Sequence, residues 1–321
     1  MNRRQFAIRM AACGGGLILD RSLEAAPRLF DPDSQDDLSP TYAESVQLAG
    51  MTVDGKQEIS FRVARFPRRG EATLWATACF GDKFYNAAME NLSLGEFKGR
   101  TPVEDQQVRF DVTGTDQAQL TRQIMQTRMP NGLLKGSAKV TFGAHQTADP
   151  PPGRGSEPLV IEARFESSHP PVKVRPGRSE VMGRIWATVR TPSGVHKFQG
   201  FGKWHEQVGE RARFASAFTY LGVMGERIGL LAVWLKAGAF GFVRLGDQIL
   251  AVKTVEFDPI GARRRFRVGL ENGRVIEGEA VTRRTISTPI EGRRRPSTTV
   301  IVKSDIGPMV GNLNDWEPEK Q

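Results

Sequence analysis

Residues 200–211 hold the densest group of chemically active side chains in this sequence. An indole, an imidazole, a carboxylate and an amide follow one another between glycines, at Trp204, His205, Glu206 and Gln207. An imidazole titrates near neutral pH, and a carboxyl group whose pKa is raised by burial can donate a proton. We therefore expect His205 and Glu206 to be catalytic candidates, with Trp204 and Gln207 contacting the ligand.

Strand geometry constrains the two titratable neighbours. Successive side chains on a β-strand point to opposite faces, so His205 and Glu206 cannot both enter one cavity unless a bulge intervenes. In a regular strand Trp204 and Glu206 share one face, and His205 and Gln207 share the other. The sequence does not fix which of them faces a ligand, and a core histidine with a hydrogen-bonded partner is the alternative for His205.

Aromatic residues on the following strands could complete a site for a hydrophobic ligand. Phe218 and Tyr220 lie on the same face of the next strand, and Trp234 lies on the strand after that. An aromatic box from Trp204, Tyr220 and Trp234 could stabilise a carbocation formed when a buried acid protonates an alkene. The alternative is that these side chains belong to the ordinary core.

Short segments in which apolar and polar residues alternate must position these side chains. Residues 58–63 and 213–220 alternate with period two, which indicates half-buried strands. The pair Asn272-Gly273 between two strand-like segments predicts a hairpin with a type I′ turn. Residues 116–129 lack glycine and proline and fit either a helix or a pair of strands. Because no βαβ alternation is visible, we predict an all-β, mostly antiparallel fold, a meandering sheet or barrel.

A break in composition divides the chain. Residues 149–156 contain three consecutive prolines beside two glycines, which cannot continue a strand or a helix. We take this segment as a linker between an N-terminal lobe at 42–148 and a C-terminal lobe at 157–321. Residues 27–41 are rich in aspartate and are expected to form a polar arm ahead of the first lobe.

The composition excludes several classes of protein. The chain has 321 residues, 39% of them hydrophobic, and a net charge of +9, which is typical of a globular protein and not of a disordered one. No apolar run approaches the ~20 residues of a membrane helix. Two cysteines exclude a disulfide framework, and four histidines show no HExxH spacing. We expect neither a metal nor another cofactor.

Short basic clusters bear on the partners of the protein. Residues 68–69, 263–265 and 293–295 lie near predicted turns, where a solvated surface is the simplest interpretation. They lack the interleaved aromatic residues on which single-stranded nucleic acids stack, so we expect no nucleic-acid partner. The alternative is contact with an anionic membrane surface, which suits a protein that collects a membrane-soluble ligand. The sequence does not fix the oligomeric state.

Residues 1–26 resemble a twin-arginine export signal. Residues 3–6 contain paired arginines and a phenylalanine, a weakly hydrophobic stretch of glycine and alanine follows, and residues 23–25 offer a cleavage site. We therefore expect a periplasmic protein, with a cytoplasmic protein that has a frayed N-terminus as the alternative. Cys13 follows an apolar tripeptide that loosely resembles a lipoprotein cleavage box, so its lipidation stays open.

Four short motifs carry a family resemblance. They are Ala163-Arg164-Phe165-Glu166, the turn Gly177-Arg178-Ser179-Glu180, the glycine frame of residues 200–211, and Arg65-Phe66-Pro67 ahead of Trp75. They resemble the AttH-like family, which includes the bacterial carotenoid hydratases (hydroxyneurosporene synthases). Over most of residues 42–321 the resemblance implies two lipocalin-like barrel or half-barrel lobes and a polyene, terpenoid or lipid-like substrate. It places Tyr220 where the hydratases have a tyrosine, whereas the family's Arg-Asp-His-Ser-Trp frame is replaced at residues 204–208.

These observations together predict an exported lipocalin-like protein that acts on a hydrophobic isoprenoid, polyene or lipid in an apolar cavity. Acid-catalysed hydration, isomerisation or cyclisation is the most specific form of the prediction. The expected catalytic residues are Glu206, His205 and Tyr220, and the expected ligand contacts are Trp204, Gln207, Phe218 and Trp234. A non-catalytic periplasmic carrier of such a ligand is the alternative, and a structural protein with a filled core is a third.

Overall fold

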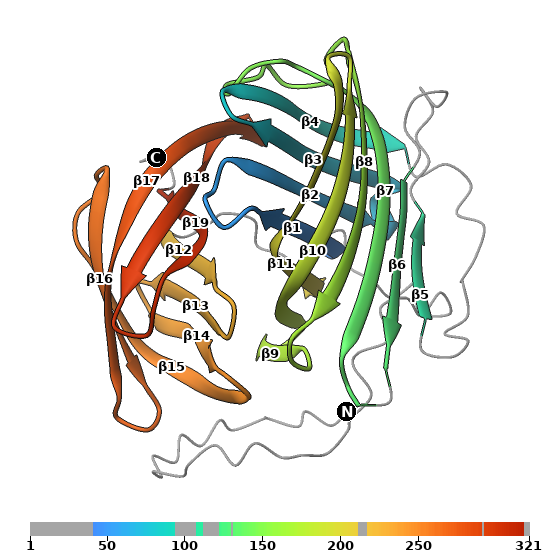
Figure 1. The fold of residues 1–321 in the computed structure, drawn as a ribbon. Helices are drawn as coiled ribbons and strands as arrows, with labels where there is room; N and C mark the ends of the chain where they lie inside the picture. The colour runs from blue at the N-terminus through green and yellow to red at the C-terminus, as the bar shows by residue number, and fades with distance from the viewer. Residues whose placement is uncertain are drawn as a thin grey trace, which may run out of the picture.

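The protein is built from two antiparallel β-sheets, which confirms the predicted all-β fold (Figure 1). The computed structural model describes residues 41–93, 107–111, 122–129, 131–210, 217–290 and 292–317. The first sheet curls into a half-barrel, and the second closes on itself as a barrel. No helix in the described residues is long and apolar enough to cross a membrane.

The curled sheet is formed by the first eleven strands. They are β1 (Tyr42–Met51), β2 (Gln57–Phe66), β3 (Glu71–Phe80), β4 (Lys83–Ser93), β5 (Gln107–Asp111), β6 (Arg122–Arg128), β7 (Leu134–Ala144), β8 (Glu157–Ser167), β9 (Val172–Arg175), β10 (Arg178–Thr191) and β11 (Gly194–Glu210). The short 3-10 helix η2 (Pro67–Arg69) joins β2 to β3. The strand order is β4-β3-β2-β1-β11-β10-β8-β7-β6-β5, with β9 beside β10. The central strands β1, β11 and β10 therefore come from opposite ends of this part of the chain.

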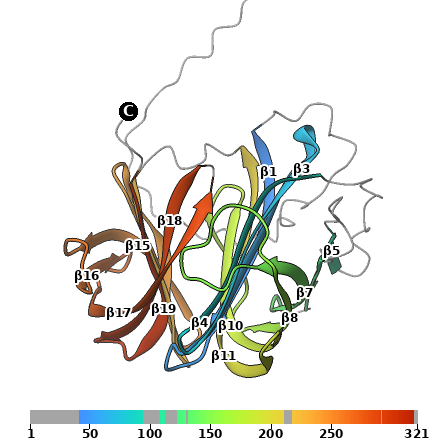
Figure 2. The same cartoon turned by 90° about the horizontal axis from the view of Figure 1, so that it is seen from above.

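The barrel is formed by the last eight strands in sequence order. They are β12 (Phe218–Met224), β13 (Ile228–Leu235), β14 (Gly238–Leu245), β15 (Gln248–Phe257), β16 (Arg263–Leu270), β17 (Val275–Ile290), β18 (Arg293–Ser304) and β19 (Met309–Trp316). Seen from above, the barrel and the curled sheet stand side by side (Figure 2). β12 pairs with β19, which closes the ring.

The division between the two sheets falls between β11 and β12, at residues 211–216, and not at the predicted linker 149–156. β7 and β8 flank that linker and pair directly, with Ala144 opposite Glu157. Prolines and glycines end a strand, but the chain can turn and pair again, so they do not mark the end of a sheet. The predicted export signal at 1–26 and all but the last residue of the predicted arm at 27–41 lie outside the described residues.

Two local predictions can be compared with the strands. Of the two structures that residues 116–129 fit, a strand is found, because Arg122–Arg128 is β6; residues 116–121 lie outside the described part. The predicted hairpin joins β16 to β17. Its loop has three residues and not two, because Leu270 pairs with Arg274 (N···O 2.8 Å) and Gly273 takes a left-handed φ of 82°.

Three large apolar clusters form most of the core of the described residues. One fills the curl of the first sheet, a second fills the barrel, and a third lies where the outside of the barrel meets β1, β10 and β11. We call this third contact the junction. Its buried members are Met51, Met182 and Phe201 from the curled sheet and Tyr220, Met224, Leu231, Val233, Phe242 and Val310 from the barrel.

The alternation along β11 separates two of these environments. Trp204 belongs to the cluster inside the curl, whereas Phe201 belongs to the junction. Lys203 also faces the junction, since its ammonium group bonds Tyr220 of the barrel. His205 and Gln207 follow on the same face as Lys203. The predicted split of the segment into two faces is therefore confirmed, and no bulge interrupts the pairing of β11 with β1 or β10 over these residues.

Candidate functional site at the junction

A histidine–carboxylate pair lies on the junction face of the curled sheet. His205 of β11 and Glu180 of β10 stand opposite each other in the ladder, and His205 Nδ1 lies 2.8 Å from Glu180 Oε1. Both side chains are buried. Arg178 donates to the same carboxylate oxygen from Nε (3.1 Å) and Nη2 (2.6 Å). The other ring nitrogen, His205 Nε2, is buried without a hydrogen-bond partner among the described residues.

Burial and charge fix the protonation states of this pair. Burial lowers the pKa of His205 and outweighs the opposing effect of Glu180, so the imidazole is neutral at neutral pH. Burial alone would raise the pKa of Glu180, but the hydrogen bond from His205 and the positive charge of Arg178 more than offset it and hold the pKa below its usual range. An ionised Glu180 accepts the Nδ1–H proton of His205, which leaves Nε2 as an unprotonated base.

A lysine–tyrosine pair lies beside the histidine. Lys203, two residues before His205, donates to the hydroxyl of Tyr220 on β12, and its ammonium lies 4.4 Å from the centroid of the Tyr220 ring. Burial lowers the pKa of Lys203 to about 8. Burial also raises the pKa of Tyr220 well above its usual value, so the phenol keeps its proton. The pair therefore offers two proton donors close to the base.

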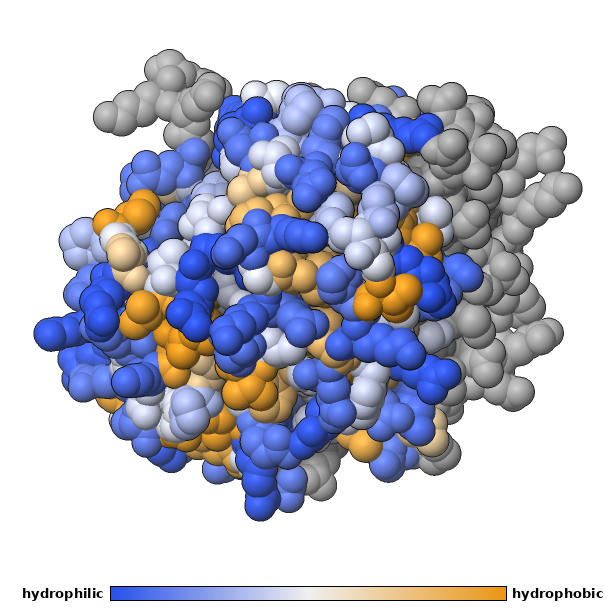
Figure 3. All heavy atoms as spheres, turned by 45° about the horizontal axis from the view of Figure 1, so that its top comes forward, coloured by the Kyte–Doolittle hydropathy of each residue, from blue (hydrophilic) through white to orange (hydrophobic). Residues whose placement is uncertain are grey.

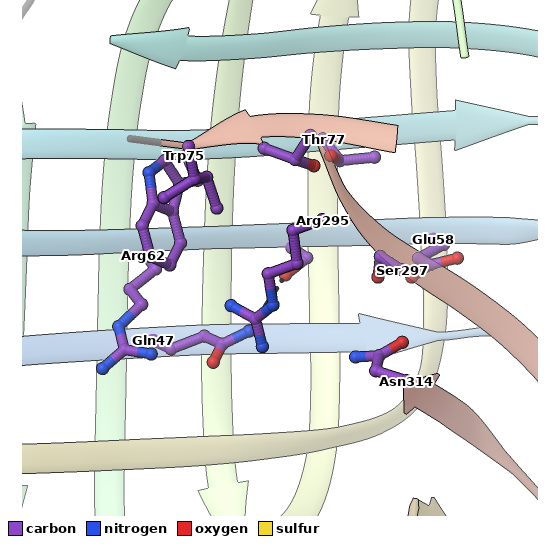
Figure 4. A pocket seen from close by; sticks show the side chains of 11 residues that line it. Gln47, Glu58, Arg62, Trp75, Thr77, Arg295, Ser297 and Asn314 are labelled. Atoms are coloured by element: carbon purple, nitrogen blue, oxygen red, sulfur yellow. Dashed lines mark hydrogen bonds between the residues drawn. The ribbon is translucent and has the colours of Figure 1, made fainter. Parts of the chain in front are cut away.

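A small polar cavity extends from this region. It has a volume of about 50 Å³, enough for one or two waters, and it lies between β1–β3 of the curled sheet and β17–β19 of the barrel (Figure 4). The lining residues are Gln47, Glu58, Ser60, Arg62, Trp75, Thr77, Thr288, Ile290, Arg295, Ser297 and Asn314. This cavity is small and polar, unlike the apolar hollow expected from the sequence.

Two arginines and a tryptophan dominate this cavity. The guanidinium carbon of Arg62 lies 5.5 Å from the centroid of the Trp75 ring, and that of Arg295 lies 5.7 Å from it. Arg62 Nη2 donates to Ser45 (2.8 Å) and to Gln207 Oε1 (3.1 Å), which ties the cavity to β1 and β11. Figure 4 shows Arg295 reaching across toward Gln47.

The structure brings part of the predicted site together. His205, Tyr220 and Gln207 all lie at the junction, and Phe218 is half-buried at its edge. Tyr220 is hydrogen-bonded to Lys203, which lies two residues before His205 on the same face of β11, and not to His205 itself.

The remaining predicted residues lie elsewhere. Trp204 is 1% exposed inside the curl, 6.0 Å from Phe165 between ring centroids, and its Nε1 donates to Glu206 (3.0 Å). Trp234 is 38% exposed and follows Val233, so it lies on the face of β13 turned away from the junction. The aromatic box of Trp204, Tyr220 and Trp234 is therefore not assembled.

Several charged residues of the site are not predicted from the sequence. In the sequence Glu180 and Arg178 stand out only as part of a turn, and nothing distinguishes Lys203 beside the tryptophan. Arg295 belongs to a cluster that the sequence predicts to be solvated, but alternate residues of a strand face opposite ways, and Arg295 faces the cavity. Arg264 of another such cluster is also buried and pairs with Asp315 at 2.6 Å. In the described residues, no group of three or more His, Cys, Asp or Glu could hold a metal ion.

The chain resembles solved structures at low sequence identity. A crystal structure of CghA with Sch210972 superposes with a TM-score of 0.56 at 11% identity, over 87% of each chain. Kievitone hydratase from Nectria haematococca gives a TM-score of 0.44 at 9% identity, over 93% of this chain and 95% of that one. No family model matches the chain, and no curated protein matches it. The CghA comparison establishes a shared two-lobed β fold.

Proposed function

We propose that this protein binds a hydrophobic small molecule at the junction and catalyses a proton transfer on it. The observation that carries the proposal is the buried Glu180–His205 pair, in which a neutral imidazole keeps Nε2 available as a base. Such a base serves isomerisation, hydration or cyclisation next to a carbonyl or another group that can hold negative charge.

An isomerisation illustrates the roles of the residues. His205 Nε2 takes a proton from a carbon beside a carbonyl, and the electron pair moves to the carbonyl oxygen. The resulting enolate accepts hydrogen bonds from Lys203 and Tyr220, while Glu180 stabilises the imidazolium. When a carbon–carbon double bond adjoins the carbon that lost the proton, the proton returns to the far end of that bond; the double bond shifts, the carbonyl is restored, and the reaction needs no co-reactant.

Electrostatics at the junction favour an anionic intermediate over a carbocation. Glu180 acts to raise the pKa of Lys203, whereas the positive charges of Arg178, Arg295 and Arg62 act to lower it, so three positive charges and one negative charge are felt there. The same charges would repel a carbocation and attract an enolate. Hydration of the kind that the AttH-like resemblance implies is therefore proposed as addition to a double bond that a carbonyl polarises.

The shared fold and the packing of the junction support a small-molecule ligand. CghA, which has this fold, was crystallised with Sch210972. The junction contains Met51, Met182 and Met224, and methionine side chains adapt readily to a ligand. Hydrophobic side chains also reach the surface in patches over the barrel, on the left of Figure 3. Because the cavity is small, binding requires the sheet and barrel to part at the junction.

Exchange of hydrogen for deuterium tests this proposal. β-Ionone, an isoprenoid enone, is incubated in D₂O with the protein, and deuterium uptake is followed by mass spectrometry. The protein should accelerate uptake, and His205→Gln should lower the rate by about 100-fold or more without changing binding. His196→Gln is the matched control, because His196 stacks on Phe80 (4.1 Å between centroids) near the start of β11.

A non-catalytic carrier is the second candidate, because neither His205 nor Glu180 lines the cavity and a group held there would not meet the base. If the wild-type protein binds β-ionone but does not accelerate deuterium uptake, the result supports the carrier function and refutes the enzyme function.

Export to the periplasm by the twin-arginine route is also part of the proposal. It rests on the paired arginines Arg3 and Arg4 and on the weakly hydrophobic stretch that follows them. Replacing both by lysine should retain the protein in the cytoplasm on cell fractionation. Unchanged periplasmic recovery would refute this route.

A further inference from the structure

We infer that the junction opens on one side only, between β9 of the curled sheet and β14 of the barrel, and that a hydrophobic molecule reaches His205 through this opening. Phe240 of β14 is the residue whose ring closes the opening, and we call it the gate. The inference rests on the proposed function in placing the ligand at the junction. The opening itself is argued from the contacts between the two sheets.

The order of the strands gives the junction two sides. On the curled sheet the order runs from β9 through β10, β11 and β1 to β2, and on the barrel it runs from β14 through β13, β12, β19 and β18 to β17. At one side the guanidinium carbon of Arg175 on β9 lies 5.2 Å from the centroid of the Phe240 ring on β14. At the other side Glu58 on β2 lies 3.3 Å from Arg284 on β17. We call these the entrance side and the fastened side.

The entrance side is joined by apolar and cation–π contacts. Val172 and Val174 of β9 pack against the junction cluster, and Arg175 lies over the Phe240 ring. Within the described part of the chain, no hydrogen bond or ion pair joins β9 to the barrel. Parting such contacts leaves no buried hydrogen-bonding group without its partner, so a local opening here costs little free energy.

The strand at the entrance is itself loosely held. β9 has four residues, it pairs with β10 alone, and the register of that pairing shifts between Arg178 and Ser179. Farther along β10, Arg184 forms an ion pair with Glu226 of the barrel, but both side chains are exposed, and an exposed ion pair adds little to stability. β9 therefore belongs to the part of the fold that opens most readily.

The fastened side is held by buried charges and hydrogen bonds. Glu58 pairs with Arg284 and accepts hydrogen bonds from Asn312 (3.2 Å) and Thr299, and Arg284 also donates to the Gly55 carbonyl (2.6 Å). A backbone hydrogen bond and an ion pair join β17 and β18 to the loop between β7 and β8. Separating a buried ion pair strands its charges, which is costly. This side therefore stays closed and acts as the hinge.

The entrance leads to the base. Arg178 lies between the two, because its guanidinium bonds Glu180, the partner of His205, and lies 5.6 Å from the centroid of the Phe240 ring. Half-buried apolar side chains from β9 and from β12–β14 pack along this side of the junction. They are Val172, Val174, Phe218, Leu235 and Phe240. A hydrophobic molecule that enters here meets apolar side chains first and the charged group next, which suits an apolar body with one reacting end.

Labelling of two thiols in the folded protein tests the inference. Val233 of β13 is buried at the junction opposite Phe240 in the ladder, so Val233→Cys places a thiol at the entrance. Cys79 of β3 is a buried thiol opposite Glu58, so it reports the fastened side. Both are labelled in a Cys13→Ser background with N-cyclohexylmaleimide, whose ring is of the size of the β-ionone ring. Peptide mass spectrometry separates the two thiols, and each rate is divided by the rate of the same thiol in urea-unfolded protein.

The entrance thiol should react about tenfold or more faster than Cys79. Phe240→Leu, which trims the gate, should raise the ratio of the two rates by a further threefold or so. Phe257→Leu is the matched control. Phe257 also lies under a guanidinium, that of Arg264 (5.2 Å), but it packs against the core of the barrel, so its replacement should not raise the ratio.

Three outcomes would overturn the inference. They are equal rates at the two thiols, faster labelling of Cys79, and a ratio that Phe240→Leu leaves unchanged. Thermal melting of each variant shows whether it is folded, and Leu231→Cys, on the same strand and in the same cluster, replaces Val233→Cys if that variant does not fold. The labelling needs neither turnover nor β-ionone, so its result and that of the deuterium experiment are independent.

Discussion

His205 and Glu180 are cross-strand neighbours whose side chains meet, with Nδ1 and Oε1 2.8 Å apart, on the face of the curled sheet that the barrel covers. The register of β10 against β11 alone places them together, so no loop has to hold the pair. A slip of one residue would send His205 into the curl and Trp204 to the junction. The long, regular ladder between these strands therefore maintains the geometry of the proposed base.

Lys203 should control the upper pH limit of the proton-transfer reaction. Burial lowers its pKa from 10.5 to about 8, and the ammonium is the form that donates. The rate of deuterium uptake by β-ionone should therefore fall as the pH rises through about 8. Lys203→Arg should move the fall to higher pH, because a guanidinium stays protonated. A rate that is constant across this range would contradict the donor role.

A buried histidine outside the base should make the fold less stable in acid. His169 Nε2 accepts the backbone N–H of Met182 (3.1 Å), Nδ1 bonds the Pro170 carbonyl (2.7 Å), and burial lowers the pKa from 6.5 to about 4. Above pH 6.5 neither the folded nor the unfolded state protonates it. Below that value the unfolded state binds the proton first, so the free energy of unfolding falls until about pH 4.

Denaturant titrations at a series of pH values measure this effect. The slope of the free energy of unfolding against pH should be smaller in His169→Gln, whose amide oxygen can still accept the Met182 N–H. An identical slope in the variant and the wild-type protein would show that His169 does not contribute.

The packing of Trp204 inside the curl depends on a glycine. A Cβ at Gly136 of β7 would overlap the Trp204 ring and lie 2.7 Å from its Cε3 atom. Gly136→Ala should lower the free energy of unfolding by about 1–3 kcal/mol. Gly261→Ala is the control, because a Cβ there meets nothing closer than 3.6 Å and should change stability by less than about 0.5 kcal/mol. Equal effects would contradict this packing.

The sequence predicted the fold class and the two faces of β11 because both follow from period-two alternation. It located one member of each pair at the candidate site, His205 and Tyr220. Their partners Glu180 and Lys203 depend on strand register and on the contact between two sheets, and single-chain periodicity contains neither. Pairing of β7 with β8 across the prolines at 150–152 is likewise a property of strand register that local composition does not contain.

The sequence also does not show which side chains fill the space where a cavity was expected. Trp204 and Tyr220 are equally aromatic, yet one fills the curl and the other lies on the outside of the barrel. Arg295 illustrates the same limit. A run of three arginines predicts a solvent-exposed surface, but the strand that contains Arg295 packs against the curled sheet, and this contact is not visible in the sequence.

Nitrogen-15 NMR of the His205 ring tests the central claim most directly. The assignment comes from the difference between the wild-type protein and His205→Gln. The account predicts a neutral ring at neutral pH, with the proton on Nδ1 and an unprotonated Nε2. An imidazolium at neutral pH, or a neutral ring with its proton on Nε2, would contradict the role of His205 as the base.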